Sequence, residues 1–89
     1  MQNFVRRTPT FKEEATRIYR NKKLTQAKLA VACGISTVTL RRYLDKPLIM
    51  PLGTVYDIIR ATDCNDYDRS ELWNALREEV ARGWKYVKD

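Results

Sequence analysis

Residues 36–44 combine small hydroxyl side chains, a branched apolar residue and two adjacent arginines. A guanidinium can donate two hydrogen bonds to guanine O6 and N7, and Val or Thr methyls can contact the thymine methyl. Thr and Val form helices less readily than the Glu, Lys and Gln that usually cover a solvated helix face. We therefore expect this segment to contact base edges in the DNA major groove, with Arg41 within reach of either a base or a phosphate. The predicted base-contacting residues are Thr37, Val38, Arg41 and Arg42.

The charge of the chain differs between its two parts. The whole chain has 17 Lys and Arg, 11 Asp and Glu, and a net charge of +6. Residues 1–62 hold twelve basic and four acidic residues, whereas residues 63–89 hold five and seven. This division indicates that only the first part meets a polyanion. A well-solvated basic surface without a nucleic-acid partner is an equal explanation of the charge taken alone.

The helices that must position these residues follow from periodicity and capping signals. Thr10 and Glu13 have the spacing of a capping box, which predicts a first helix over residues 11–20. A second helix is expected from Thr25 to Gly34, because glycine takes the left-handed conformation that ends a helix without strain.

Two further helices are expected in the middle of the chain. Ser36 is a favourable N-cap for the third, which ends before Pro47 because proline pushes the preceding residue out of helical geometry. After Pro51, a largely buried fourth helix is expected to reach about Ala61. Its apolar residues are Leu52, Val55, Tyr56, Ile58 and Ile59.

The chain is predicted to end in an acidic turn over residues 63–68 and a fifth helix. Asp68 or Ser70 is expected to cap this helix, which would run to about Trp84. The sequence thus predicts an all-α fold, a compact five-helix domain. The predicted parts are a flexible basic arm over 1–9, the main helical domain over 10–62, and a C-terminal turn and helix over 63–89.

Residues 26–44 carry the features that let two helices cross steeply over a short turn, which requires close approach. Ala30 is small, Gly34 is suited to the positive φ of the turn, and Ile35 fills the angle between the helices. Over about residues 10–61 the pattern resembles the helix-turn-helix domain of the lambda repressor and Cro family. The residues that match are Leu24, Thr25, Gln26, Ala30, Gly34, Ile35 and Leu40.

The resemblance implies a small transcription regulator of phage or prophage type that binds double-stranded DNA. It also implies that Gln26 bonds a backbone phosphate, as a glutamine of the family does. The dipole of a helix N-terminus favours an anion there too, although an exposed residue without a ligand is an equal explanation. Phosphate contacts set register and affinity without reading sequence. The predicted ones are Lys22, Lys23, Gln26, Lys28, Ser36 and Lys46.

Both ends of the chain have a predicted role in binding. Arg6 and Arg7 form an arm that either follows the DNA or is a simple tail. In the last helix, an apolar seam at helical spacing exceeds what a small core needs, although packing on the first and fourth helices is its default role. A two-fold homodimer would place two recognition helices roughly 34 Å apart on a two-fold operator. The predicted dimer residues are Trp73, Leu76, Val80 and Trp84.

Several classes of function are not expected. The chain has no histidine, and Cys33 and Cys64 lack metal-site spacing, since Cys-only sites use four thiolates. Without a Gly-rich phosphate loop or a nucleophile motif, no enzyme activity, cofactor, metal or small-molecule ligand is expected. No apolar run approaches the roughly 20 residues of a membrane helix, and the N-terminus lacks a signal-peptide pattern. A cytoplasmic protein without a membrane partner is predicted.

Three alternatives remain open from the sequence. A protein-interaction module, antitoxin-like or anti-repressor-like, would keep the fold without DNA binding, but it should have lost the cationic face with Arg41 and Arg42. RNA binding ranks lower, because RNA readers expose aromatic residues. Within DNA binding, a repressor is preferred to an activator or a recombination accessory protein.

Overall fold

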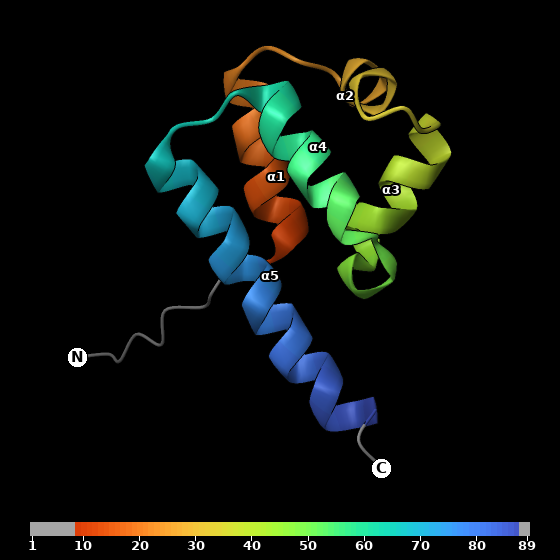
Figure 1. Cartoon of the computed structure of the whole chain (residues 1–89), viewed down its shortest axis with the longest axis vertical. Helices are drawn as coiled ribbons and strands as arrows, with labels where there is room; N and C mark the ends of the chain where they lie inside the picture. The colour runs from red at the N-terminus through yellow and green to blue at the C-terminus, as the bar shows by residue number, and fades with distance from the viewer. Residues whose placement is uncertain (1–8, 88–89) are drawn as a thin grey trace, which may run out of the picture.

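The structure, a computed structural model, describes the backbone of residues 9–87 and the side chains of residues 9–83. Five α-helices and one short 3-10 helix form the described part, which contains no strand (Figure 1). This confirms the predicted all-α class and the number of α-helices. The elements in chain order are α1 (Phe11–Asn21), α2 (Gln26–Ala32), α3 (Thr37–Asp45), η1 (Pro47–Ile49), α4 (Leu52–Thr62) and α5 (Asp66–Val87).

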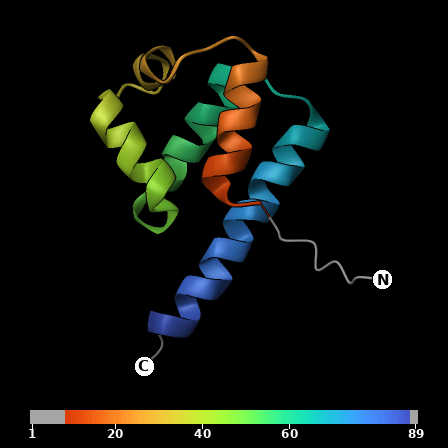
Figure 2. The same cartoon turned by 180° about the vertical axis from the view of Figure 1, so that it is seen from behind.

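The helices pack in two connected groups. α1 lies along α5, whereas α2 packs on both α3 and α4, and α3 also contacts α1. The second half of α5 extends beyond the other helices in both views (Figures 1 and 2). Within residues 9–87, no helix is both long and apolar enough to cross a membrane.

The predicted helix starts are confirmed for α1, α2 and α3. Thr10 and Glu13 make both hydrogen bonds of a capping box, at 3.1 Å to the amide of Glu13 and 2.9 Å from the amide of Thr10. The hydroxyls of Thr25 and Ser36 accept from the third backbone amide of their helices, at 3.1 and 3.0 Å. Local side-chain chemistry therefore sets where the first three helices begin.

The predicted start of the last helix is wrong. α5 begins at Asp66, and Asn65 caps it by accepting a 2.8 Å hydrogen bond from the amide of Asp68. Asp68 and Ser70, the predicted caps, lie inside the helix. The Asp68 side chain instead binds Arg17 of α1 at 2.9 Å. The cap of α5 therefore lies three residues before Asp68.

One core joins all five helices, with the largest side chains fully buried. On α4 the buried residues are Thr54, Val55, Ile58 and Thr62. The prediction that Tyr56 and Leu52 are buried is wrong, because their side chains are 53% and 60% exposed. They lie on the flank of the helix rather than on the face toward the core. The fully buried large hydrophobic residues are Phe11, Ile18, Leu29, Leu40, Leu44, Val55, Ile58 and Leu72.

The segment between α3 and α4 forms η1, a short helix that the sequence did not predict. Pro47 and Met50 are buried, and η1 packs on α5. A Cβ atom on Gly83 would collide with the side chain of Leu48, so glycine permits this close approach. Leu48 thus packs against α5, although Leu48 and Ile49 remain 51% and 49% exposed.

Gly34 gives a test of the turn that follows α2. Its φ is +71°, and a Cβ built there would meet no atom within 4 Å, so only backbone strain opposes a side chain. We expect Gly34→Ala to lower the free energy of unfolding by about 1–2 kcal/mol in urea denaturation followed by circular dichroism.

Gly53 is the matched control for this substitution. It lies in α4, outside the left-handed region, with open space around its Cβ position. Gly53→Ala should leave stability unchanged or raise it by up to about 1 kcal/mol. Equal effects of the two substitutions would contradict a special backbone requirement at Gly34.

Candidate nucleic-acid interface

The turn between α2 and α3 determines how α3 is presented. The carbonyl of Ala30 accepts hydrogen bonds from the amides of Cys33 and Ile35, at 3.1 and 3.0 Å. Ala30 is buried, so its small side chain lets the neighbouring helix come close. Gly34 then reverses the chain at positive φ. The turn places α3 at the outer edge of the molecule in both views (Figures 1 and 2).

The four predicted base-contacting residues share the outer side of α3. Leu40 and Leu44 are fully buried on the inner side. On the outer side, Val38 is 63% exposed, Arg41 and Arg42 are exposed, and Thr37 is half-buried. Their spacing places them together, because residues three and four apart are neighbours on a helix surface. The free protein thus offers this surface to solvent.

The predicted phosphate-contacting residues fall into three places. Lys22 and Lys23 are exposed in the connection from α1 to α2, and Lys23 has a left-handed backbone with a φ of 60°. Gln26 is the half-buried first residue of α2. These three residues therefore share one segment, and this connection runs along the top of the molecule in Figure 1.

The other predicted contacts are more dispersed. Lys28 is exposed on α2, whereas Lys46 lies at the far end of α3. The Ser36 hydroxyl accepts from the amide of Thr39 and donates to its hydroxyl, at 3.0 and 2.9 Å, so capping already occupies it. The predicted arm residues, Arg6 and Arg7, lie outside the described residues.

Ion pairing separates the cations of the described chain into two groups. No acidic residue occurs between Glu14 and Asp45 in the sequence. Within residues 9–83, no ion pair involves the cations of α2, α3 or the connections around them. These cations are Lys22, Lys23, Lys28, Arg41, Arg42 and Lys46.

Most arginines of the other helices, by contrast, have carboxylate partners; within residues 9–83 the exceptions are Arg20, which has no ion pair, and Arg77, which binds the amide oxygen of Asn74. Arg17 binds Glu14 at 2.8 Å and Asp68 at 2.9 Å, and these two hydrogen bonds, Glu14 first, raise its pKa above the ordinary value. Arg60, Arg69 and Arg82 each pair with an acidic residue three positions earlier. Within residues 9–83, most of the cations left for an external anion therefore lie on α2, α3 and their connections, and Arg20 of α1 and Arg77 of α5 are the others.

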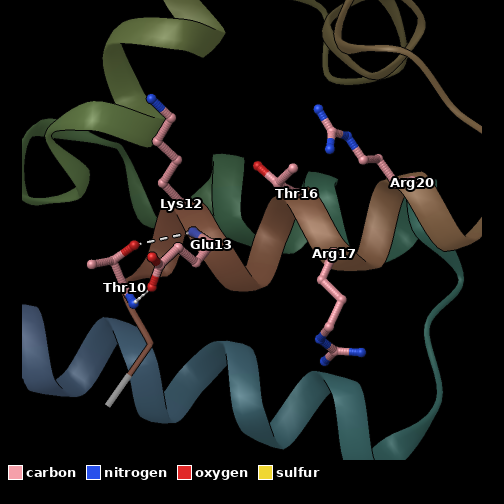
Figure 3. Close-up of a pocket in the computed structure, with 6 residues that line it drawn as sticks. All are labelled: Thr10, Lys12, Glu13, Thr16, Arg17 and Arg20. Carbon is pink, nitrogen blue, oxygen red and sulfur yellow. Dashed lines mark hydrogen bonds between the residues drawn. The ribbon is translucent and has the colours of Figure 1, made fainter. Parts of the chain in front are cut away.

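The structure places residues of α1 next to the candidate interface that the sequence pattern did not single out. Lys12, Thr16 and Arg20 point toward α2 and α3, whereas Arg17 points toward α5 (Figure 3). Together they line an open depression on α1. Lys12, Thr16 and Arg20 are spaced four residues apart, and this spacing, which indicates a shared helix face, was available in the sequence.

The predicted dimer residues only partly match the packing of α5. Leu72 and Ala75 fill the core, while Trp73 and Leu76 are half-buried and Val80 is 47% exposed. Trp73, Leu76 and Val80 border a shallow depression, and the ring of Trp73 meets that of Tyr56 edge-on at 5.4 Å. The side chain of Trp84 lies outside the described residues.

Comparison of the chain with known protein families, curated proteins and solved structures finds no match. The evidence for function is therefore the exposed surface of α3 and the distribution of the cations that have no ion pair in the described part of the chain. The similarity to the lambda repressor and Cro family stays a prediction from the sequence.

Cys33 is the buried C-cap residue of α2, and its chemistry follows from burial. Burial raises the pKa of its thiol to about 11, with a smaller contribution from the charge of Asp57. Both cysteines are free, and no group of residues within 9–83 has the composition of a metal site. The thiol is therefore neutral, and its role is packing.

We expect Cys33 in the folded protein to react slowly with iodoacetamide. In a Cys64→Ala chain at pH 8, alkylation should be roughly a hundredfold slower than in urea, because the thiolate is the reactive form. The native rate should keep rising until the pH reaches about 11. A rate that levels off near pH 9 would contradict the raised pKa.

Proposed function

We propose that the chain is a sequence-specific regulator of transcription that binds double-stranded DNA and inserts α3 into the major groove. The observation that carries this proposal is the outer face of α3, where Arg41 and Arg42 are exposed beside Val38 and have no ion pair within residues 9–83. A buried or neutralised face would have removed the basis for it. Arginine, threonine and valine at these positions supply both hydrogen-bond donors and methyl groups for base edges.

The elements around α3 are suited to hold it on the DNA backbone. Lys22 and Lys23 lie next to the first turn of α2, where Gln26 and the helix dipole favour a phosphate. These contacts set orientation and affinity, and α3 reads the sequence. This division of roles agrees with the lack of ion pairs for the cations of this region within the described side chains, residues 9–83.

We further propose a homodimer that represses transcription by covering a two-fold operator. The support is the shape of α5, whose second half extends beyond the other helices (Figure 1). On α5 itself, Trp73, Leu76 and Val80 remain partly exposed. A two-fold contact between copies through α5 would pair two recognition helices on one side of the duplex.

Selection from a random duplex library tests the proposal. We expect enrichment of one sequence with two symmetric half-sites about one helical turn apart. A single half-site would retain DNA binding and remove the dimer. Recovery of no sequence above background would overturn specific DNA binding and favour a protein-interaction module.

Arg42→Ala tests base reading by α3. On the selected duplex, we expect a loss of about 1–3 kcal/mol of binding free energy and relaxed preference at one or two base pairs. Fluorescence anisotropy with the selected and random duplexes measures both. Arg60→Ala is the matched control, an exposed arginine on α4 that is paired with Asp57. Equal weakening on both duplexes would make Arg42 a phosphate contact.

Lys23→Asn tests the predicted phosphate contacts without adding backbone strain, since asparagine tolerates the left-handed conformation. Affinity should fall on all duplexes, and the slope of log K against log salt should become shallower by about one. Titration at several salt concentrations measures the slope. A loss restricted to the selected duplex would contradict a phosphate contact.

A further inference from the structure

Asp45 is the only acidic residue of α3, and it lies on the same side as the two arginines. It follows Arg41 by four positions and Arg42 by three, and pairs at these spacings meet on a helix surface. Arg42 and Asp45 also border the same depression, with Lys46 and Ile49. The carboxylate is thus placed where it can neutralise the groups proposed to read bases.

The structure gives Asp45 a different partner. Nζ of Lys12 donates to Oδ1 of Asp45 at 2.8 Å, which joins the first turn of α1 to the last residue of α3. About half of each side chain is exposed, 50% for Lys12 and 51% for Asp45. Within residues 9–83, Arg41 and Arg42 keep no ion pair.

Stability of the fold gives little reason for this arrangement. A carboxylate at the C-terminus of a helix is unfavourable, because that end of the dipole is already negative. An ion pair exposed to this degree contributes little to folding. Its clear effect is on local charge, since it occupies the single carboxylate of α3 near the arginines.

We propose that Lys12 is a positioning residue for DNA binding: by holding Asp45, it keeps Arg41 and Arg42 free to contact DNA. This inference rests on the proposed function of α3. Without the ammonium group, the Asp45 carboxylate turns to the arginine one helical turn away. It then competes with the DNA for the same guanidinium groups and repels nearby phosphates.

A mutant cycle between Lys12 and Asp45 tests the proposal by titration with the duplex recovered from selection. Lys12→Met keeps the methylene stem and should weaken binding roughly threefold, in line with exposed charge pairs. Lys12→Arg should bind like the wild-type chain. The key result is rescue: the double variant with Lys12→Met and Asp45→Asn should bind as tightly as Asp45→Asn alone.

Two results would overturn the proposal while leaving DNA binding intact. If Lys12→Met weakens binding by the same factor in the wild-type chain and in the Asp45→Asn variant, Lys12 is a direct phosphate contact. If Asp45→Asn alone weakens binding and lowers the melting temperature, the pair is a structural tie. Failure of the wild-type chain to bind the duplex at all would overturn the proposed function itself.

Discussion

The close approach of α2 and α3 is the constraint on which the rest of the structure depends. The carbonyl of Ala30 accepts two amide hydrogens from the turn, and Gly34 reverses the chain at positive φ. A larger residue at either position would push the helices apart or strain the backbone. Because the turn is tight, Leu40 and Leu44 reach the core while the opposite side of α3 remains in solvent.

Ion pairs and polar contacts distinguish the supporting helices α1 and α5 from the pair formed by α2 and α3. Arg17 links α1 to α5 through Asp68, and the amide of Phe11 donates to the carboxylate of Glu79 on α5 at 3.0 Å. These polar links hold the supporting helices together. Every buried side-chain nitrogen or oxygen among the described residues has a hydrogen-bond partner, so burial of these polar groups does not destabilise the core. The cations around α2 and α3 take no part in these links, and the pair of Lys12 with Asp45 preserves this separation.

Several apolar residues outside the core serve interfaces between elements. Leu48 of η1 meets α5 at Gly83, and Tyr56 of α4 meets Trp73 of α5. α5 is thereby held at both its first and its second half, although much of its length extends beyond the other helices. These two contacts fix the position of α5, although its apolar side with Trp73, Leu76 and Val80 is partly exposed.

Local signals in the sequence determined the all-α class, the caps of α1, α2 and α3, and the turn at Gly34. Capping and helix periodicity involve residues within four positions of one another, so the sequence displays them directly. The start of α5 at Asp66 is also set by a local contact, from the amide of Asp68 to the side chain of Asn65, although it was predicted at the wrong residue. The exposure of Tyr56 and the pairing of Lys12 with Asp45, by contrast, were decided by tertiary structure alone. Each depends on which distant helix lies opposite a given face, and that follows from the crossing of packed helices rather than from neighbouring residues.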